Sequence, residues 1–595
     1  MKQNINSKAK YFDSIRSYTK YFKYLKPYMK YQYMVSVLIL GSSFLALINP
    51  MILRVMIDRV LVLNELYLLP YLIIILCIFY IINTLVMHTS GFLSVYSGEL
   101  IALRLRKELL SYIQKVKLEA FIDSNNGDLV SKITGDVDTI TNFLNTIIPT
   151  LFNNLTNIVA ILVLMLAFNW RLSLIVIVVT FLQFFVSVKF SKIVRENQKN
   201  SRENVAQHIS FLQHVFSGIK FIKAYRSESL NKRKYNGILK DNLNINLKGF
   251  YIHFGYSSIL SIISFIGSIL ILSVGIHEIT RGNLTIGTLF VFDTIADRFY
   301  YFSMGLVNIN IELQNIIVAI DRVNSIFCLE SEDYSNKKSN MKNKSITFEN
   351  VSFSYGEGSR IFKNINIELV EGDVYALVGA SGQGKTTVSN LLLNFYQPDK
   401  GNIYLGNENI NDIDLKHLRK VITIVFQEQG MIDGSIKENI LLNNNAKIKL
   451  SKLQEILELC FIDDFVKNLP NKLETVIGEG GEKLSYGQRQ RILLARGILR
   501  DSSIYIFDEA LANLDKSLES DIFENLQKML TGKTQIYITH NTNIIKKIEN
   551  IIVISDGKVE GMGNHDYLMK SSHSYRLFCL QDEKMKEEFR SDEKN

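Results

Sequence analysis

Cysteine is scarce in this chain of 595 residues, and the four that it has are scattered. They are Cys77, Cys328, Cys460 and Cys579, with none of the paired spacings that mark disulfide frameworks or zinc sites. This pattern argues against a disulfide-stapled fold and fits a reducing compartment. A signal peptide is also missing, because the first apolar run starts too late in the chain and is too long. The length of the chain predicts two or more domains.

Charged residues are nearly absent from six long stretches in the first half of the chain. These apolar runs cover residues 33–53, 66–92, 143–168, 172–188, 254–276 and 285–308. A helix of about 20 apolar residues crosses a bilayer core, so each run is long enough to form a transmembrane helix. We therefore predict an all-α transmembrane domain of six helices over residues 31–329.

Positive charge is concentrated outside these runs. Lys and Arg crowd residues 1–30 and the long connector 189–248, whereas the connectors after the first, third and fifth runs are short. A nucleic-acid-binding arm would have a similar composition, but basic residues beside a membrane span mark its cytoplasmic side. We expect residues 1–30 and both long connectors to be cytoplasmic, with no nucleic-acid partner. Aromatic residues within 1–30 predict an interfacial helix at the lipid headgroups.

The two long connectors have the apolar periodicity of helices. This predicts that the membrane helices continue beyond the bilayer into the cytosol. In the second connector, the apolar residues Ile219, Phe221, Ile222 and Tyr225 predict a short helix at the turn. Such a helix would be able to press on a partner domain.

The second half of the chain has the composition of a soluble domain. Residues 330–344 are polar and lack apolar periodicity, which predicts a linker. Beyond it, short β-type runs alternate with helical patterns, which is typical of an α/β domain, here over residues 345–585, followed by a polar tail at 586–595. The predicted strands are 345–353, 373–378, 421–425, 504–507, 535–538 and 551–554.

A phosphate-binding loop follows the second of these strands. Residues 379–387 read GASGQGKTT and lead into a helical pattern, which is the strand–loop–helix context that the motif requires. Glycines let backbone N–H groups wrap phosphate oxygens at a helix N-terminus. Lys385 is expected to reach the β- and γ-phosphates, and the Thr386 hydroxyl to ligate Mg²⁺. The predicted contacts of ATP in this loop are Gly379, Ser381, Gly382, Gly384, Lys385, Thr386 and Thr387.

An apolar strand later in the chain ends in two carboxylates, Asp508 and Glu509. A solvated acidic pair at a strand end is the plain alternative, but the phosphate-binding loop favours a catalytic role. Asp508 is expected to hold the hydration shell of Mg²⁺. Glu509 is placed to orient or deprotonate the attacking water.

Residues 484–491, LSYGQRQR, lie between the phosphate-binding loop and this acidic strand. With the three motifs in this order, the second half resembles the nucleotide-binding domain of an ABC transporter. The whole chain resembles a half-size ABC exporter over residues 20–585. Four weaker segments of the membrane half support the resemblance in the same order: NPMILRVMIDRV at 49–60, GDLVSKITGDVDTI at 127–140, GNLTIGTL at 282–289 and AIDRVNSIF at 319–327.

The resemblance implies further contacts of the nucleotide. Tyr355 would stack on the adenine ring. Gln427 would sense the γ-phosphate and Mg²⁺, and would contact the turning helices of the membrane domain. Together with Thr386 and Asp508, Gln427 would complete the Mg²⁺ site.

The resemblance also implies that a dimer forms the ATP sites. Ser485, Gly487 and Gln488 of the signature segment would face the nucleotide held by another chain. Asp515 matches the D-loop aspartate and His540 the switch histidine. A lone histidine after a strand is usually structural, but the place of His540 in this order of motifs favours the functional role.

Three positions depart from the pattern of the family. Tyr486 stands where the signature usually has glycine, residues 512–515 read ANLD where SALD is common, and Asn541 stands where arginine is frequent. A bulky Tyr486 would weaken closure over the opposite nucleotide. Hydrolysis is nevertheless expected to survive, because the signature serine, the following glycine and Glu509 are all present. The departures leave open a heterodimer with two unequal ATP sites.

Asp293, Asp297 and Arg298 lie within the sixth apolar run, where charges are costly. Asp293 and Asp297 are four residues apart and share a helix face. One interpretation is a local Asp–Arg pair that neutralises itself. The other is a polar wall of the translocation cavity that prefers cationic or polar cargo.

The sequence predicts ATP-driven export of an amphipathic or hydrophobic cargo, such as a drug, lipid or small peptide. The chain would work as a homodimer in the cell membrane, with ATP and Mg²⁺ as ligands and the nucleotide-binding domain in the cytoplasm. One alternative is half of a heterodimeric exporter. Another is a regulatory membrane subunit that binds ATP and transports little itself. The motifs do not identify the cargo.

Overall fold

The computed structural model describes residues 26–122, 126–332, 343–356, 358, 360–427, 430–442, 448–512 and 514–580. The interfacial helix predicted in the N-terminal segment, most of the predicted linker and the polar tail lie outside these residues. The chain divides into two compact units. One comprises Met1–Gln114 and Ser124–Leu329, and the other comprises Lys115–Asp123 and Glu330–Asn595.

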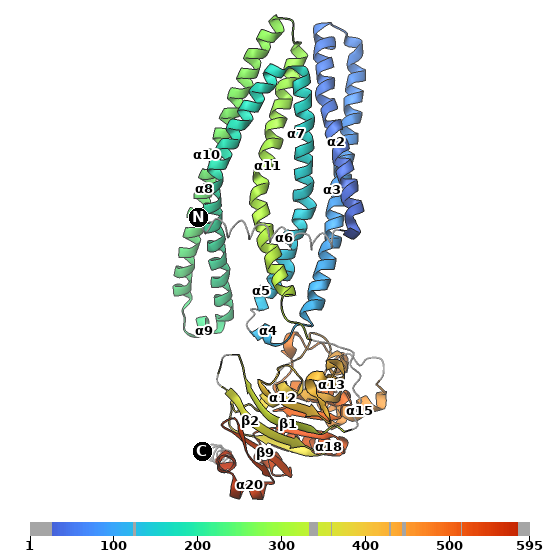
Figure 1. Ribbon diagram of the computed structural model, residues 1–595, viewed down its shortest axis with the longest axis vertical. Helices are drawn as coiled ribbons and strands as arrows, with labels where there is room; N and C mark the ends of the chain where they lie inside the picture. The colour runs from blue at the N-terminus through green and yellow to red at the C-terminus, as the bar shows by residue number, and fades with distance from the viewer. Residues whose placement is uncertain are drawn as a thin grey trace. The chain divides into compact units, whose positions relative to one another are not determined.

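The regular elements among the described residues of the first unit are all helices (Figure 1). Its long helices are α2 (Met29–Val55), α3 (Leu69–Ile113), α7 (Ile148–Phe168), α8 (Trp170–Ser217), α10 (Glu228–Thr280) and α11 (Ile286–Phe327). Between them lie α5 (Asn126–Ser131), α6 (Val137–Asn142), α9 (Ile219–Ala224), the 3-10 turns η1 (Lys26–Tyr28) and η3 (Leu66–Leu68), and the π-helical stretches η2 (Met56–Val62), η4 (Lys132–Asp136) and η5 (Phe143–Ile147).

The long helices coincide with the predicted spans. Five helical segments of the described chain are long and apolar enough to cross a membrane, and the sixth, α11, carries the three charges noted in the sequence. The most apolar window of α3 has no side chain buried inside the protein. Helices that satisfy their own backbone hydrogen bonds can expose such surfaces to lipid. The predicted six-helix transmembrane domain is confirmed.

Helices α8 and α10 run side by side and are joined at one end by α9 (Figure 1). Both continue far beyond their apolar runs, as the connector periodicity predicts. Phe221 and Tyr225, at the turn, are 71% and 79% exposed. Lys220, Lys223 and Arg226 flank them, and such charges are costly to bury in hydrocarbon.

Two of the weak membrane motifs meet at the N-terminus of α11. Asp58, from the first motif, accepts a hydrogen bond from the Gly287 backbone N–H at 2.8 Å and one from the Thr285 hydroxyl at 2.7 Å. A carboxylate at this position satisfies a free helix N–H group and complements the helix dipole. Asp58 therefore ties η2 to the start of α11.

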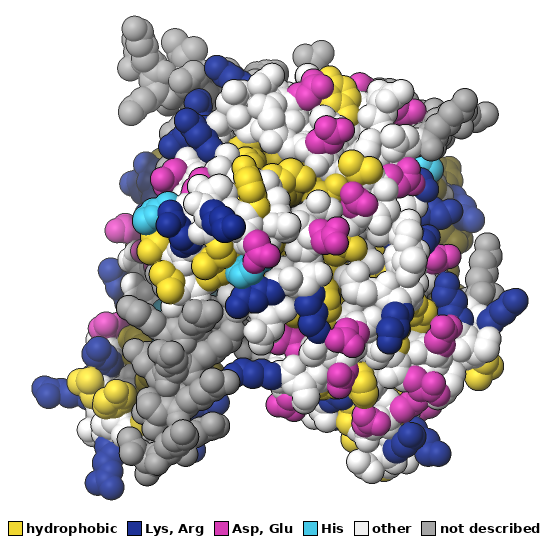
Figure 2. Space-filling view, turned by 90° about the horizontal axis from the view of Figure 1, so that it is seen from below, with side chains coloured by type: hydrophobic (Ala, Val, Ile, Leu, Met, Phe, Trp, Pro, Cys, Tyr) yellow, Lys and Arg dark blue, Asp and Glu magenta, His cyan; other side chains and the backbone are white. Residues whose placement is uncertain are grey.

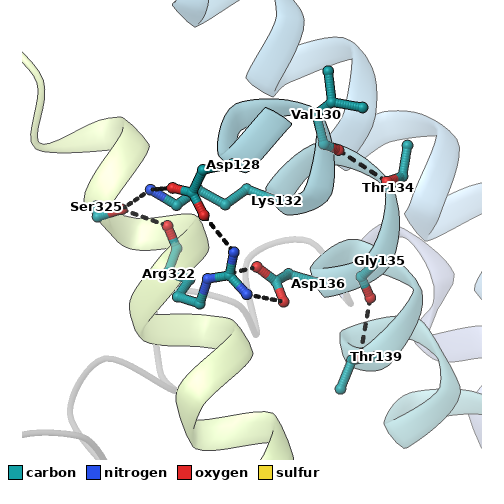
Figure 3. Close-up of polar contacts among 9 residues, drawn as sticks. All are labelled: Asp128, Val130, Lys132, Thr134, Gly135, Asp136, Thr139, Arg322 and Ser325. Atoms are coloured by element: carbon teal, nitrogen blue, oxygen red, sulfur yellow. Dashed lines mark hydrogen bonds and ion pairs between the residues drawn. The ribbon is translucent and has the colours of Figure 1, made fainter. Parts of the chain in front are cut away.

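The other two motifs meet near the C-terminus of α11 (Figure 3). The Arg322 guanidinium contacts Asp128 of α5 at 2.6 Å and Asp136 of η4 at 3.3 Å. Lys132 contacts Asp128 at 2.9 Å and donates to the Ser325 hydroxyl at 3.1 Å. The two cations and two carboxylates neutralise one another. They join α11 to the chain that leads into α7.

The second unit contains two sheets. Its strands are β1 (Ile346–Ser354), β2 (Arg360–Leu369), β3 (Val374–Val378), β4 (Lys400–Leu405), β5 (Glu408–Asn409), β6 (Ile422–Val425), β7 (Ile504–Asp508), β8 (Thr534–Ile538), β9 (Asn550–Ser555) and β10 (Lys558–Gly563). The smaller sheet is antiparallel with order β2-β1-β4-β5. The larger has order β10-β9-β3-β8-β7-β6 and is parallel apart from β10.

The helices of this unit beyond β3 are, in chain order, α12 (Lys385–Leu392), α13 (Leu415–Val421), α14 (Ile436–Leu441), α15 (Leu450–Leu459), α16 (Ile462–Val466), α17 (Tyr486–Leu499), α18 (Lys516–Met529), α19 (Thr542–Ile545) and α20 (His565–Ser571). The buried side chains of α14 to α20 form one core with the larger sheet, whereas those of α12 and α13 belong to the core that includes the smaller sheet. Alternate residues of β7 enter two different cores. Tyr505 and Phe507 pack with α17 and α18, whereas Ile504 and Ile506 pack toward the smaller sheet. Strands buried on both faces explain the continuous apolar runs in the sequence.

The predicted α/β domain is confirmed, and the structure adds strands that the sequence analysis missed. These are β2, β4, β5 and β10, which lie in antiparallel pairs. The face of this unit around α20 is turned toward the viewer in Figure 2. Acidic and basic side chains are interspersed there with scattered hydrophobic ones, which is typical of a surface in water.

A short segment that follows α3 folds with the second unit. It includes α4 (Glu119–Ile122) and pairs with the chain after α11. The Lys117 N–H donates to the Glu330 carbonyl at 2.9 Å, and the Glu332 N–H to the Lys115 carbonyl at 2.6 Å. Both oxygens of the Glu332 carboxylate accept from Arg419, at 2.8 and 2.6 Å. A bidentate pair of this kind is geometrically specific, so it holds the pairing in place.

Replacing Arg322 with methionine tests the ionic cluster of Figure 3. The substitution leaves Asp136, whose side chain is 13% exposed, without its counter-charge. Because the cluster is partly exposed, we expect a loss of about 1–2 kcal/mol, less than the about 3–5 kcal/mol typical of fully buried pairs. Thermal unfolding of the purified chain in detergent should shift to lower temperature.

The matched control is Arg106→Met. Arg106 is as exposed as Arg322, but its partner Asp138 has a side chain that is 62% exposed. Its loss should cost at most about 0.5 kcal/mol. Equal shifts in unfolding temperature for the two variants would contradict the idea that the burial of Asp136 makes its ion pair the more important one.

Candidate functional site

The phosphate-binding loop connects β3 to α12. Gly379 follows β3, and a Cβ atom there would collide with the carbonyl oxygen of Ile554. Gly384 has φ +91°, and a Cβ atom would lie 2.7 Å from the Phe362 ring. Gly382, at φ +81°, has open space around it. Glycine alone adopts such angles without strain, so the loop closes tightly against the start of α12.

Lys385 lies across this loop. It is 7% exposed, and its Nζ donates to the carbonyls of Gly379 at 2.7 Å and Ala380 at 3.1 Å. Burial lowers the pKa of Lys385, and the carboxylates of Glu509 and Asp508 oppose this shift. Phosphate oxygens at the loop would favour the charged ammonium further.

Asp508 ends β7 at the same edge of the sheet. Strand β8 pairs in parallel with both β3 and β7, so their carboxyl ends meet there. Burial raises the pKa of Asp508, while a hydrogen bond with Thr386 lowers it. The structure therefore brings Thr386, Lys385 and Asp508 together. The Thr386 hydroxyl and the Asp508 carboxylate supply oxygen ligands of the kind that Mg²⁺ prefers.

Glu509 and His540 face each other at the ends of β7 and β8. Glu509 Oε1 and His540 Nε2 are 3.2 Å apart. Glu509 has φ +50°, a strained angle for a side chain with a Cβ atom, and its N–H donates to the Ile538 carbonyl at 2.8 Å. Both side chains remain partly exposed, at 27% and 42%. The pair can reach a water molecule at the edge of the sheet.

The Tyr355 ring, just after β1, belongs to an aromatic cluster. It lies edge-on to Phe353 and Tyr396, with ring centroids at 4.9 and 5.0 Å. Its hydroxyl donates to Thr387 at 3.2 Å and accepts from Asn390 at 3.2 Å. These contacts fix the half-buried ring against the beginning of α12. Ser381 is exposed at the loop itself.

The signature residues lie at the N-terminus of α17. The Ser485 hydroxyl accepts from the Gln488 N–H at 3.3 Å, and the Gln488 side chain accepts from the Ser485 N–H at 2.9 Å. This capping box starts the helix. Ser485 is exposed and Gly487 half-buried. The polar side chains of Ser485 and Gln488 bond to each other's backbone rather than to the phosphate-binding loop.

Tyr486 makes a contact that the sequence analysis missed. Its hydroxyl donates to the backbone carbonyl of Gln427 at 3.0 Å, and the Arg489 guanidinium lies 5.8 Å from the centre of its ring. Gln427 follows β6 and is half-buried. The residue that replaces glycine in the signature is thus bonded within its own chain. No local sequence signal indicates a partner 59 positions away.

The other two departures also have defined surroundings where the structure describes them. Asn541 caps α19 through the Asn543 N–H at 2.9 Å and donates to Glu519 at 2.7 Å. Asp515 precedes α18, and its carbonyl accepts from the Glu519 N–H at 2.8 Å. Asn513 lies outside the described residues. Glu519 therefore connects the segment after β7 with the segment after β8.

The fold and this edge of the sheet define an ATPase of the phosphate-loop class, fused to a membrane domain. Two family models match the chain: the ABC transporter transmembrane region over residues 33–301 and the ABC transporter domain over residues 362–512. The chain belongs to the ABC transporter family, as a half-size exporter with both domains in one polypeptide. It is a multi-pass membrane protein with ATPase activity that drives export.

Individual relatives agree with this assignment. The chain is 30% identical to an ATP-dependent lipid A-core flippase of Wigglesworthia glossinidia brevipalpis, over 83% of this chain and 86% of that protein. It is 29% identical to the lactococcin-G-processing and transport ATP-binding protein LagD of Lactococcus lactis subsp. lactis, over 84% and 71%. The structure of a bacterial Atm1-family ABC exporter with ATP bound has the same fold, with a TM-score of 0.77, 21% identity and coverage of 94% and 98%.

The Gly384→Ala and Gly382→Ala variants test the geometry of the loop. Both place a Cβ atom at a left-handed angle, which costs about 1–2 kcal/mol. Only the Cβ atom at position 384 would also collide with the side chains of Phe362 and Ile361. Gly384→Ala should therefore weaken binding of a fluorescent ATP analogue much more than Gly382→Ala does. Circular dichroism would check that both variants are folded, and equal affinities would contradict the close approach at Gly384.

Proposed function

We propose that this chain forms a homodimer that exports an amphipathic or hydrophobic cargo, such as a drug, lipid or small peptide, by alternating access. The observation that carries the proposal is the contact between Glu509 and His540, 3.2 Å apart, beside Lys385 and Asp508 at one edge of the sheet. A carboxylate that contacts a histidine beside a phosphate-binding loop is suited to activating water for ATP hydrolysis.

The nucleotide would bind along the loop and the first turn of α12. Backbone N–H groups of residues 379–387 surround the phosphates, and Lys385 turns from its carbonyl partners to the β- and γ-phosphates. Tyr355 offers a ring face to the adenine. The fit to Mg²⁺ rests on the contact between Thr386 and Asp508, with Gln427 as the third oxygen donor. Mg²⁺, when bound, would neutralise charge on the phosphate oxygens.

Hydrolysis would begin at Glu509. Its carboxylate orients the attacking water and accepts a hydrogen bond from it as the water approaches the γ-phosphate. His540 contacts the carboxylate at 3.2 Å, and the Ile538 carbonyl accepts from the Glu509 N–H and fixes its backbone. Because the backbone angle of Glu509 is strained, the position of its side chain is imposed by the fold.

The dimer would complete each ATP site. Ser485 and Gly487 begin α17, where N–H groups and the helix dipole favour an anion. In the proposed dimer, they face the γ-phosphate held by the other copy, and Asp515 lies at the same interface. The capping box, which bonds Ser485 to Gln488, leaves the Ser485 side chain exposed for this contact.

The turn at α9 would transmit closure to the membrane helices. Phe221 and Tyr225 are large, exposed and flanked by basic residues, so lipid does not cover them. They suit a groove on the ATPase domain of the other copy. The basic connectors also support a place in the cell membrane in which α9 and the ATPase domain lie on the cytoplasmic side.

Glu509→Gln tests the catalytic assignment. In the purified chain reconstituted in lipid, the substitution should reduce ATP hydrolysis at least about 100-fold, because the amide cannot take up a proton. The matched control is Glu524→Gln on α18, an exposed acid paired with Lys547, which should retain activity. An inactive unmodified chain would contradict the homodimer and favour either half of a heterodimer or a regulatory subunit.

A mixed dimer tests whether each ATP site is shared between copies. Lys385→Ala should inactivate the phosphate-binding loop and Ser485→Arg the signature, so that neither variant hydrolyses ATP alone. Differently tagged copies of the two variants, purified as a mixed dimer, contain one intact loop facing one intact signature. Activity should return in that dimer. No recovery, with the mixed dimer shown to form, would contradict composite sites.

A further inference from the structure

A cavity of about 510 Å³ lies between four helices of the membrane domain. Its polar lining includes Asn154 of α7, Gln183 of α8, Ser261 and Ser264 of α10, and Asp297 and Tyr300 of α11. Leu260 and Met304 supply apolar surface. A cavity with both kinds of wall is typical of a binding site for an amphipathic molecule.

Asp297 is the one charged residue among those that line this cavity. Among the described residues, it forms no ion pair with Arg298, so the self-neutralising pair considered from the sequence is not present. Arg298 instead donates to the Ala46 carbonyl at 3.1 Å and lines a smaller neighbouring cavity of about 310 Å³, which Asp297 also borders. Asp293, one turn earlier, accepts from Ser268 and does not line either cavity.

Two further polar atoms in the cavity wall have unused hydrogen-bonding capacity. Tyr300 is 5% exposed and Gln183 is 1% exposed. In the part of the chain that the structure describes, the Tyr300 hydroxyl and Gln183 Oε1 have no hydrogen-bond partner. The amide nitrogen of Gln183 donates to the Ser264 hydroxyl at 2.7 Å and holds the side chain in place. Buried polar atoms are normally paired, so a small movement of these side chains toward a molecule in the cavity would gain each of them a hydrogen bond.

We infer that this cavity is a cargo subsite for an amphipathic molecule that carries a protonated amine. An ammonium group has three N–H donors and needs three acceptors. The exposed Asp297 carboxylate offers two oxygen acceptors and the charge, and the unpaired Gln183 and Tyr300 side chains of the same wall hold further acceptors. An anionic headgroup would meet a carboxylate and no base in this wall. The inference rests on the proposed export function and names the class of its cargo.

A series of amphiphiles with one alkyl chain and different heads separates the possibilities. Dodecylamine offers charge and N–H donors, dodecyltrimethylammonium offers charge alone, dodecanol is neutral and dodecyl sulfate is anionic. Binding of each is measured by equilibrium dialysis, without ATP, to the full chain in phosphatidylcholine nanodiscs, with protein-free nanodiscs as the blank. Dodecylamine should bind about tenfold tighter than dodecanol, as one charge-assisted contact implies, and dodecyltrimethylammonium should lie between them.

Three variants connect this preference to the cavity. Asp297→Asn should abolish the preference for dodecylamine, and Asp297→Glu should keep most of it. The control Asp293→Asn removes the same charge from the same face of α11 and should leave the preference intact. Thermal unfolding checks that each variant is folded, and Asp297→Glu tests the charge even where the amide variant is unstable.

Two results would overturn the inference. One is equal binding of dodecylamine and dodecyl sulfate, and the other is an unchanged preference in Asp297→Asn. Because these measurements need no ATP, they are independent of the hydrolysis assay with Glu509→Gln. A chain that hydrolyses ATP but does not discriminate among the heads would retain the proposed function and lose the amine-bearing cargo.

Discussion

The parallel alignment of β3, β8 and β7 is the constraint on which the ATPase site depends. It brings the carboxyl ends of three strands to one edge, where Lys385, Asp508, Glu509 and His540 follow them. Burial lowers the pKa of Lys385 and raises the pKa of Asp508, which favours the neutral form of each group. The charge on each group opposes the pKa shift of the other. The sheet thereby holds opposite charges close together in a position where a nucleotide and a cation would favour both charged forms.

Helix α11 has a comparable role in the membrane domain. Asp58 binds its N-terminus, and Arg322 joins its C-terminal part to Asp128 and Asp136. The four weak membrane motifs form two pairs, one near each end of this helix. Between these pairs, α11 carries Asp297 into a cavity wall. A helix fixed at both ends can place a charge at bilayer depth reproducibly, which is the condition for using that charge in recognition.

Local patterns in the sequence predicted the parts of the fold that depend on local physics. Buried strands such as β7 are continuous apolar runs, and the phosphate-binding loop needs glycine at defined angles, so both were found. Strands β2, β4 and β10 have no two consecutive buried residues, so they form no continuous apolar run, and they were missed. The contacts of Arg322 with Asp128 and of Tyr486 with Gln427 join residues far apart in the chain. Periodicity holds no information on such pairs, although the motifs marked most of the participating segments.

The contact of Tyr486 with Gln427 has a consequence for how two ATP sites would communicate. In the proposed dimer, Gln427 belongs to the site built on the phosphate-binding loop of its own copy, whereas Ser485 and Gly487 belong to the site of the other copy. The Tyr486 hydroxyl joins these two elements within one chain through a single hydrogen bond of 3.0 Å. A glycine in the signature has no side chain for such a bond. A shift of Gln427 toward its own nucleotide would therefore pull on the N-terminus of α17, and closure at one site would bear directly on the other. The tyrosine would then be a physical connection between the sites, as well as a larger side chain that closure has to accommodate.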